Sequence, residues 1–208
     1  MLGNFKKAIF RVLCLYCVLI GGGLMAKPTP EELFDRGEDI LNFALNGGGG
    51  TFRPDSLEAK EYYIQAKEYF EKACELNYAK GCVNLGSLYE SDNLVIGEKN
   101  PRLKERLKKA VQYYSKACDL NDKFGCSWLG AMQYQGKVVV KNEKQAMKKF
   151  EKACKLGYKE ACEMVTHKGL CELGHKEACE IFSLEVLCRL LDPKACGMSY
   201  DKRKALGF

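Results

Sequence analysis

The chain has 208 residues, of which 47% are hydrophobic and 29% are charged, and its formal net charge is +6 at pH 7. This length and composition fit one elongated folded domain, and a weak positive charge interleaved with acidic residues argues against a nucleic-acid-binding surface. The sequence has twelve cysteines and only two histidines, so the role of the cysteines is the first question that it raises.

Residues 1–26 have the pattern of a secretion signal. Three basic residues precede an apolar run, 12–24, that is short for a membrane span. We expect cleavage after Ala26, although Leu24 is large for the −3 position, and an uncleaved anchor is the alternative. Cleavage would remove two cysteines and lower the net charge to +3, leaving ten cysteines in an oxidising compartment.

The first helix is expected over 30–45, because Thr29 can cap it and Pro30 suits the first helical position. Four glycines, 47–50, should end this helix. A second helix is expected over 57–76. We interpret 30–45 as a degenerate first member of the repeats that follow.

Three segments align on a cysteine: AKEYFEKAC (66–74), AVQYYSKAC (110–118) and AMKKFEKAC (146–154). Each has alanine eight residues and one residue before the cysteine and an aromatic residue four before it. Spacings of four and eight lie on one helical face, so this stripe should pack in a core. We call these segments helix B.

A second pattern starts at a cysteine, in CVNLGSLYE (82–90) and CSWLGAMQY (126–134), and we call it helix A. Both segments carry Leu-Gly three and four residues after the cysteine. Glycine inside a helix costs about 1 kcal/mol relative to alanine, so another helix should cross closely there. The period is 44 residues and then 36, and an enlarged loop at 91–102 explains the longer one. The sequence therefore predicts an all-α, α/α solenoid of helix A and helix B pairs.

Ten cysteines form five pairs at one fixed offset of eight residues. An unbroken helix of eight residues spans about 12 Å, whereas the Cα atoms of a disulfide lie roughly 4.4–6.8 Å apart. Bonded pairs therefore require the chain to reverse between their members. The pairs are Cys74/Cys82, Cys118/Cys126, Cys154/Cys162, Cys171/Cys179 and Cys188/Cys196.

Residues that can end a helix lie between the members of each pair. In four pairs an asparagine or glycine stands three residues after the first cysteine, where a left-handed residue would fit. We interpret each pair as a disulfide that staples a helical hairpin across its turn; in the repeats this joins helix B to the next helix A. Zinc binding or free thiols in a reducing compartment are the alternative. The terminating residues are Asn77, Asn121, Gly157, Gly174 and the segment 191–193.

After Cys162 the period falls to 17 residues and Val165-Thr166 replaces Leu-Gly. Each unit of this tail can hold only one short helix, for example 177–188. We therefore expect a signal at 1–26, a solenoid at 27–162, and a shortened, stapled tail of the same domain at 163–208.

The segments LGSLY (85–89) and LGAMQYQGKVVVKNEKQAMKKFEKAC (129–154), with the C-x7-C spacing, resemble Sel1-like repeats and, more specifically, the secreted Helicobacter cysteine-rich proteins. The resemblance covers 57–162 and implies a solenoid related to tetratricopeptide repeats, with a disulfide in each repeat. It also implies penicillin binding and weak β-lactamase activity. Gln133 departs from the pattern, which has tyrosine there, as at Tyr89.

The sequence contains no catalytic signature that would perform such hydrolysis. K-T-G and G-x-S-x-G are absent, and S-D-N occurs only at 91–93, in the enlarged loop. The one S-x-x-K, at Ser199–Lys202, lies far after it in the chain and is interpreted as coincidence. His167 and His175 are expected in solvated turns. We expect no metal site and no cofactor, and catalytic residues are unknown.

Helical solenoids present helix A side chains along a concave surface to peptides or partner proteins. Trp128 could anchor a ligand there or could simply pack between repeats. We expect a secreted or periplasmic monomer that binds a protein, peptide or cell-wall fragment, with no nucleic-acid partner. A β-lactam amide hydrolase and a purely structural envelope protein that meets host factors are the alternatives. The candidate ligand-binding residues are Asn84, Leu88, Trp128 and Gln133.

Overall fold

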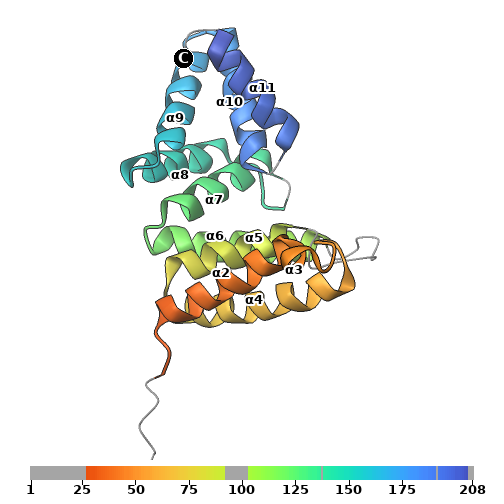
Figure 1. Ribbon diagram of the computed structural model, residues 1–208. Coiled ribbons are helices and arrows are strands. Elements are labelled where there is room, and N and C mark those ends of the chain that lie inside the picture. The colour runs from red at the N-terminus through yellow and green to blue at the C-terminus, as the bar shows by residue number, and fades with distance from the viewer. Residues whose placement is uncertain (1–26, 92–102, 137, 191, 206–208) are drawn as a thin grey trace, which may run out of the picture.

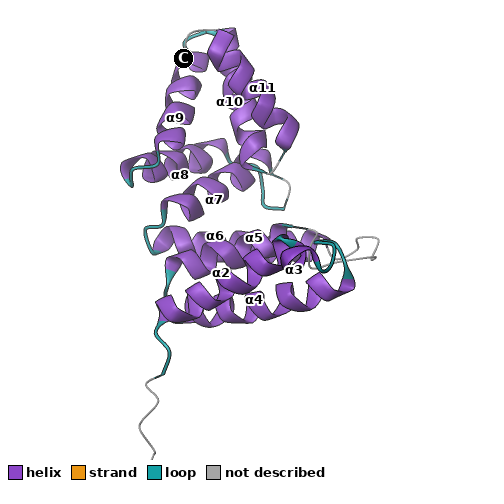
Figure 2. Cartoon of the chain, in the orientation of Figure 1, coloured by secondary structure: helices purple, strands orange, loops and turns teal. Residues whose placement is uncertain are grey.

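The computed structural model describes residues 27–91, 103–136, 138–190 and 192–205. The predicted signal segment and most of the loop 91–102 lie outside these ranges. The described residues are helical and contain no strand, as predicted (Figure 2). The helices are α2 (Pro30–Leu45), α3 (Gly47–Gly50), α4 (Leu57–Glu75), α5 (Ala79–Glu90), α6 (Leu103–Asp119), α7 (Lys123–Gln135), α8 (Glu143–Lys155), α9 (Lys159–Glu172), α10 (Lys176–Arg189) and α11 (Pro193–Ala205).

The start of α2 confirms the predicted cap. The Thr29 hydroxyl accepts a hydrogen bond from the Glu32 backbone, and the Glu32 carboxylate accepts one from the Thr29 backbone. These two bonds satisfy N–H groups that have no partner within the helix. The four glycines of α3 all have positive φ, which ends the regular helix at Leu45.

Helices α2 to α8 form a stack of helix pairs, α2 with α4, α5 with α6 and α7 with α8 (Figure 1). Helix A of the sequence is α5 or α7, with α2 as the degenerate first copy, and helix B is α4, α6 or α8. The predicted stripe is fully buried in all three helix B segments: Ala66, Phe70, Ala73, Ala110, Tyr114, Ala117, Ala146, Phe150 and Ala153. The 3.6-residue pattern therefore identified the core face correctly.

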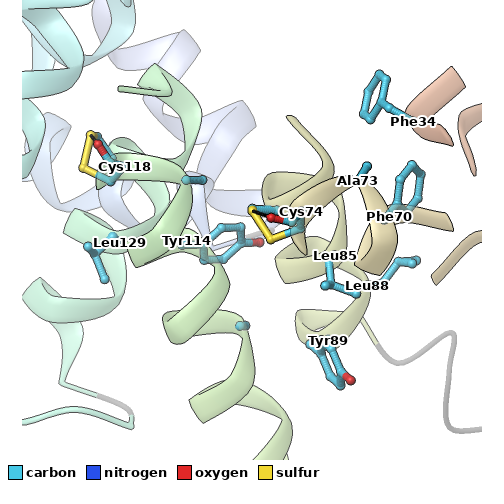
Figure 3. Packing of buried hydrophobic residues seen from close by; sticks show 14 of the residues in the cluster. Phe34, Phe70, Ala73, Cys74, Leu85, Leu88, Tyr89, Tyr114, Cys118 and Leu129 are labelled. Atoms are coloured by element: carbon cyan, nitrogen blue, oxygen red, sulfur yellow. Dashed lines mark hydrogen bonds between the residues drawn. A yellow bond between two sulfur atoms is a disulfide. The ribbon is translucent and has the colours of Figure 1, made fainter. Parts of the chain in front are cut away.

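One hydrophobic core runs through the first repeats, and its side chains project from α2, α4, α5, α6 and α7 (Figure 3). A smaller core joins α7 and α8 to the tail, where the Phe182 ring lies 5.1 Å from that of Tyr134 and 6.3 Å from that of Phe150. Lys152 adds a polar link between repeats, because its Nζ donates to the Cys118 carbonyl at 2.7 Å.

All five predicted disulfides are present, with Cα atoms 4.4 to 4.7 Å apart. The chain reverses between the members of each pair, as the spacing required. Asn77, Asn121, Gly157 and Gly174 all have positive φ, which confirms the left-handed residues. The bonds are Cys74–Cys82, Cys118–Cys126, Cys154–Cys162, Cys171–Cys179 and Cys188–Cys196.

The disulfide Cys188–Cys196 staples the last chain reversal of the tail. It joins α10 to α11, two single helices, just as Cys171–Cys179 joins α9 to α10. Its chain reversal differs, because the Asp192 carboxylate accepts hydrogen bonds from the first backbone N–H groups of α11. Cys196 is half-buried on α11, and its Sγ lies 3.7 Å from the Cys188 carbonyl oxygen.

The tail consists of single helices, as its short period predicted. Cys162 and Cys171 both lie on α9, and Cys179 and Cys188 both lie on α10, so each of these helices is stapled at both ends. Both α9 and α11 pack against α10 at the end of the stack (Figure 1).

Candidate functional site

A groove crosses the helix A side of the repeats, where α2, α5 and α7 lie in succession. It encloses about 500 Å³, within the range of ordinary ligand sites. We call it the helix A groove. It is lined by Phe34 and Glu38 from α2, by Lys80, Val83 and Asn84 from α5, by Asn121–Phe124 at the start of α7, and by Leu156 after α8.

Two aromatic rings give the groove its apolar character, and two lysines together with Glu38 and Asp122 give it charges of both signs. Lys80 Nζ lies 5.8 Å from the centre of the Phe34 ring, and Lys123 Nζ lies 5.3 Å from that of Phe124. Phe124 is also exposed, although large apolar side chains are usually covered. The groove therefore offers apolar contact area with positive charge beside it.

The polar groups of the groove can both donate and accept hydrogen bonds. The Asn84 amide donates to Glu38 Oε1 at 3.5 Å, a long bond that a ligand could displace. An asparagine amide can pair with both the N–H and the C=O of a peptide group. Asp122 is already engaged, because its Oδ1 accepts from the Gly125 backbone at 2.8 Å and caps α7.

Of the four predicted ligand-binding residues, only Asn84 lines this groove. Leu88 requires a correction: it is 4% exposed and packs in the main core, because its spacing of three from Leu85 places both on the inward face of α5. Trp128 is half-buried and stacks on Tyr114, with ring centres 5.7 Å apart, so it packs between repeats. Gln133 is also half-buried, and its Oε1 meets no donor among the described residues.

The tail holds a polar cluster that the sequence did not indicate. His167 is 3% exposed, and its Nδ1 lies 3.0 Å from Glu185 Oε2. Arg203 Nη1 lies 3.8 Å from Glu185 Oε1 and 2.7 Å from Glu163 Oε2. The cluster thus joins α9, α10 and α11. Burial raises the pKa of Glu185, while the hydrogen bond from His167 opposes that shift.

This cluster overturns the expectation that His167 lies in a solvated turn. The residue falls in the middle of α9 with its ring turned inward, where Glu185 compensates its burial. His175, in contrast, is exposed at the position before α10, as expected. No three His, Cys, Asp or Glu side chains within the described ranges come together as a metal site would require.

The S-x-x-K motif does not form a serine–lysine pair of the catalytic type. Ser199 is buried in the interior of α11, and its hydroxyl has no hydrogen-bond partner among the residues described. Lys202 instead forms an ion pair with Glu180 of α10. A nucleophile must face substrate and contact a base, and Ser199 does neither in this arrangement.

A family model for the Sel1 repeat matches three consecutive segments of the chain, residues 43–78, 79–122 and 124–158. The chain belongs to the Sel1 repeat family. Each match contains a helix B, and the second and third begin at or just after the start of a helix A. The matches include most of the residues that line the helix A groove, but Phe34 and Glu38 of α2 and Lys123 lie outside them.

Relatives from Helicobacter pylori confirm the resemblance found in the sequence. The chain is 42% identical over 104 residues to a protein named "Putative beta-lactamase HcpC" and 40% identical over 90 residues to "Beta-lactamase HcpA". These matches cover 48% and 43% of this chain but only 28% and 29% of the relatives. The chain thus spans less than a third of either protein.

Two solved structures are also similar. The Helicobacter pylori cysteine-rich protein B is 38% identical, with 65% of this chain and 96% of that chain covered and a TM-score of 0.40. A Sel1 repeat protein from Oxalobacter formigenes is 21% identical, with 65% and 47% covered and a TM-score of 0.46. In the described part of this Sel1 repeat protein, no helix has the length and apolar character needed to cross a membrane.

Proposed function

We propose that this Sel1 repeat protein works outside the cytoplasm and binds an extended peptide segment of another protein in the helix A groove. The observation that carries the proposal is the groove itself, to which three successive helix A elements contribute side chains. Solenoids commonly bind partners along such a repeated surface. A peptide in extended form would run across α2, α5 and α7 and contact side chains from each of them.

The chemistry of the groove favours a peptide with acidic and apolar side chains. Lys80 and Lys123 can each pair with a carboxylate, and the Phe34 and Phe124 rings provide apolar contacts. Asn84 can bind the peptide backbone itself. A cell-wall fragment that carries a peptide stem would meet the same groups, and it is the alternative ligand.

Five disulfides support the proposed location. Disulfides persist in secreted and periplasmic proteins, whereas cytosolic thiols are kept reduced. Residues 1–26 would supply the export signal, and residues 27–162 and 163–208 would then be the solenoid and the tail of one exported domain.

The experiment is selection of binders from a library of extended peptides on oxidised residues 27–208. A selected peptide should lose about tenfold or more of its affinity on Asn84→Ala or Lys123→Glu, because each removes a polar or charged hydrogen-bonding group. Lys148→Glu changes an exposed lysine on α8, outside the groove, and is the matched control. Equal losses for Lys123→Glu and Lys148→Glu would place the binding site elsewhere.

Hydrolysis of β-lactams is the second candidate, and it rests on the names of relatives that are about two-fifths identical. Nitrocefin turnover by the same oxidised protein tests it. Because Ser199 is buried and Lys202 pairs with Glu180, any turnover should survive Ser199→Ala unchanged. A rate equal to that of buffer would remove this candidate and leave peptide binding untouched.

A further inference from the structure

A second and larger cleft lies in the tail, between α9 and α11. It encloses about 860 Å³ and is separate from the helix A groove. Glu163, Thr166 and His167 line it from α9, and Tyr200, Arg203 and Lys204 line it from α11. We call it the tail cleft.

The α9 side of this cleft corresponds to a helix face that is covered in the preceding repeats. Thr166 lies four residues after Cys162, just as Gly86 follows Cys82 and Gly130 follows Cys126. Gly86 and Gly130 are buried, because the next helix B places Tyr114 on the first and Phe150 on the second. Thr166 is exposed instead.

The neighbouring positions of α7 show the same contrast, whereas on α5 the corresponding Val83 and Ser87 are half-buried. On α7, Ser127 and Ala131 lie one and five residues after the cysteine, and both are fully buried beneath α8. On α9 the residue one after the cysteine is Glu163, which is exposed. The residue five after it is His167, which is covered by Glu185 of α10. The tail cleft is thus the place that a helix B would fill.

The short period of the tail explains why this chain supplies no such helix. Because α9 carries both Cys162 and Cys171, the chain passes directly from α9 into α10 without a separate helix B. Across the cleft, α11 reaches α9 through Arg203, whose Nη1 lies 2.7 Å from Glu163 Oε2. The rest of this α9 face stays open.

We propose that the tail cleft receives one amphipathic α-helix of a partner protein, in the place of the absent helix B. The walls define what that helix must carry. Thr166 has a side chain where the repeats have glycine, so the helix presents a small residue there rather than an aromatic ring. Tyr200, which is 60% exposed, offers an apolar ring on the opposite wall.

Charge on the α11 wall selects an acidic helix. Residues 202–204 are all basic, and Arg203 and Lys204 line the cleft directly. Arg203 is balanced by Glu163, but Lys204 forms no ion pair among the described residues. An acidic residue on the partner helix would pair with Lys204, whereas a basic helix would meet the basic end of α11.

The probe is a peptide built on α8, the helix B that covers this face in the preceding repeat. It has the sequence 143–155 with Phe150→Ala and Cys154→Ser, every lysine replaced by glutamate, and a hydrocarbon bridge on its outer face. The bridge is needed because a peptide this short is only marginally helical in water. A matched peptide keeps the lysines, and a third carries Met147→Pro in the acidic sequence to prevent the helix.

Fluorescence anisotropy on oxidised residues 27–208 measures the affinities. We expect the acidic helix to bind at least tenfold more tightly than the basic helix and the proline peptide. The Thr166→Trp variant, in which the new ring fills the cleft, should bind the acidic helix at least tenfold more weakly than the native protein does. Lys204→Glu should weaken it severalfold. Asn84→Ala should change nothing, so failure here is distinct from failure of the groove proposal.

Five results would overturn the proposal. Absence of binding at millimolar protein, or equal binding to Thr166→Trp, would show that the cleft takes no helix. Equal binding of the proline peptide would indicate an extended ligand, and competition by millimolar acetate would indicate a simple carboxylate site. Equal affinity for the basic peptide would reject the role of charge.

Discussion

The ring of Tyr114 lies directly on Gly86, so that a Cβ atom at residue 86 would stand 2.6 Å from the ring. This distance is far below van der Waals contact. Tyr114 cannot move away easily, because its hydroxyl lies 3.0 Å from Glu90 Oε2 and its ring stacks on Trp128. The pair fixes how closely α5 and α6 approach, and α5 carries the centre of the helix A groove.

Gly86→Ala should therefore destabilise the protein by about 1–3 kcal/mol, the usual cost of overpacking a core. Urea unfolding of the oxidised protein, followed by Trp128 fluorescence, measures it. Gly169→Ala on α9 is the matched control, since a Cβ there meets nothing within 4 Å. It should stabilise by about 0.5–1 kcal/mol through helix propensity alone. Similar effects at both positions would contradict the close crossing.

The disulfides should differ in how easily they are reduced. Both cysteines of Cys74–Cys82 and of Cys118–Cys126 are buried in the main core, whereas those of Cys171–Cys179 and of Cys188–Cys196 are only half-buried. Cys154–Cys162 is half-buried as well. Thiol exchange requires access to sulfur, so mild reductant should cut these half-buried disulfides before the two in the main core. Alkylation and peptide mapping over time give the order. Reduction of the two core disulfides before those of the tail would contradict the observed burial.

Loss of one staple should be costly in a tail with little core. A closed loop of about nine residues contributes roughly 2.5 kcal/mol in the chain-entropy estimate. The Cys171→Ser/Cys179→Ser double variant should lower the free energy of unfolding by about that amount, or less where strain is relieved. Proteolysis confined to α9–α11 would show that the first repeats stay folded. Unchanged resistance of the tail would argue against a role for this disulfide.

Stability should depend on pH through Glu185. Burial raises its pKa above the ordinary value of 4.5, so the folded protein holds this proton more tightly than the unfolded chain does. The stability that this proton contributes is fully present below pH 4.5, and it is lost as pH rises through the pKa of Glu185 in the folded protein. His167, Glu163 and Arg203 face the same carboxyl, and a substitution of Glu185 alone leaves these three residues in place.

The Glu185→Gln variant isolates this contribution, because its amide does not titrate. Relative to Glu185→Gln, the native protein should become less stable as pH rises from 4.5 through the raised pKa of Glu185, while other carboxyl groups shift both proteins alike. Urea midpoints at each pH measure the difference. A difference that stays constant with pH, or that changes in the opposite direction, would contradict the effect of burial on Glu185.

The repeat fold was accessible from sequence because its determinants are local. Ala66, Phe70 and Ala73 lie within two helical turns, and Asn77 stands inside the loop closed by Cys74–Cys82. Each pattern also recurs, so one interpretation accounted for several segments. The groove was only partly accessible, since Phe34 and Lys123 come from distant segments whose packing the sequence does not state.

The tail cluster could not be inferred from spacing. His167, Glu185 and Arg203 lie on three helices and follow no repeat pattern, so each resembled a solvated residue until the helices were placed. Leu88 shows the opposite error. The helix that carries Leu88 was predicted correctly, but the side of the helix was not. Leu88 lies three residues after Leu85, so both side chains point into the core.

The most direct test of peptide binding in the helix A groove is backbone amide NMR of the oxidised protein, titrated with a selected peptide. We expect the shifted amides to cluster at Lys80–Asn84 of α5 and Lys123–Phe124 of α7, with the outer face of α8 unchanged. Shifts confined to helix B surfaces, or spread evenly over the protein, would contradict the account.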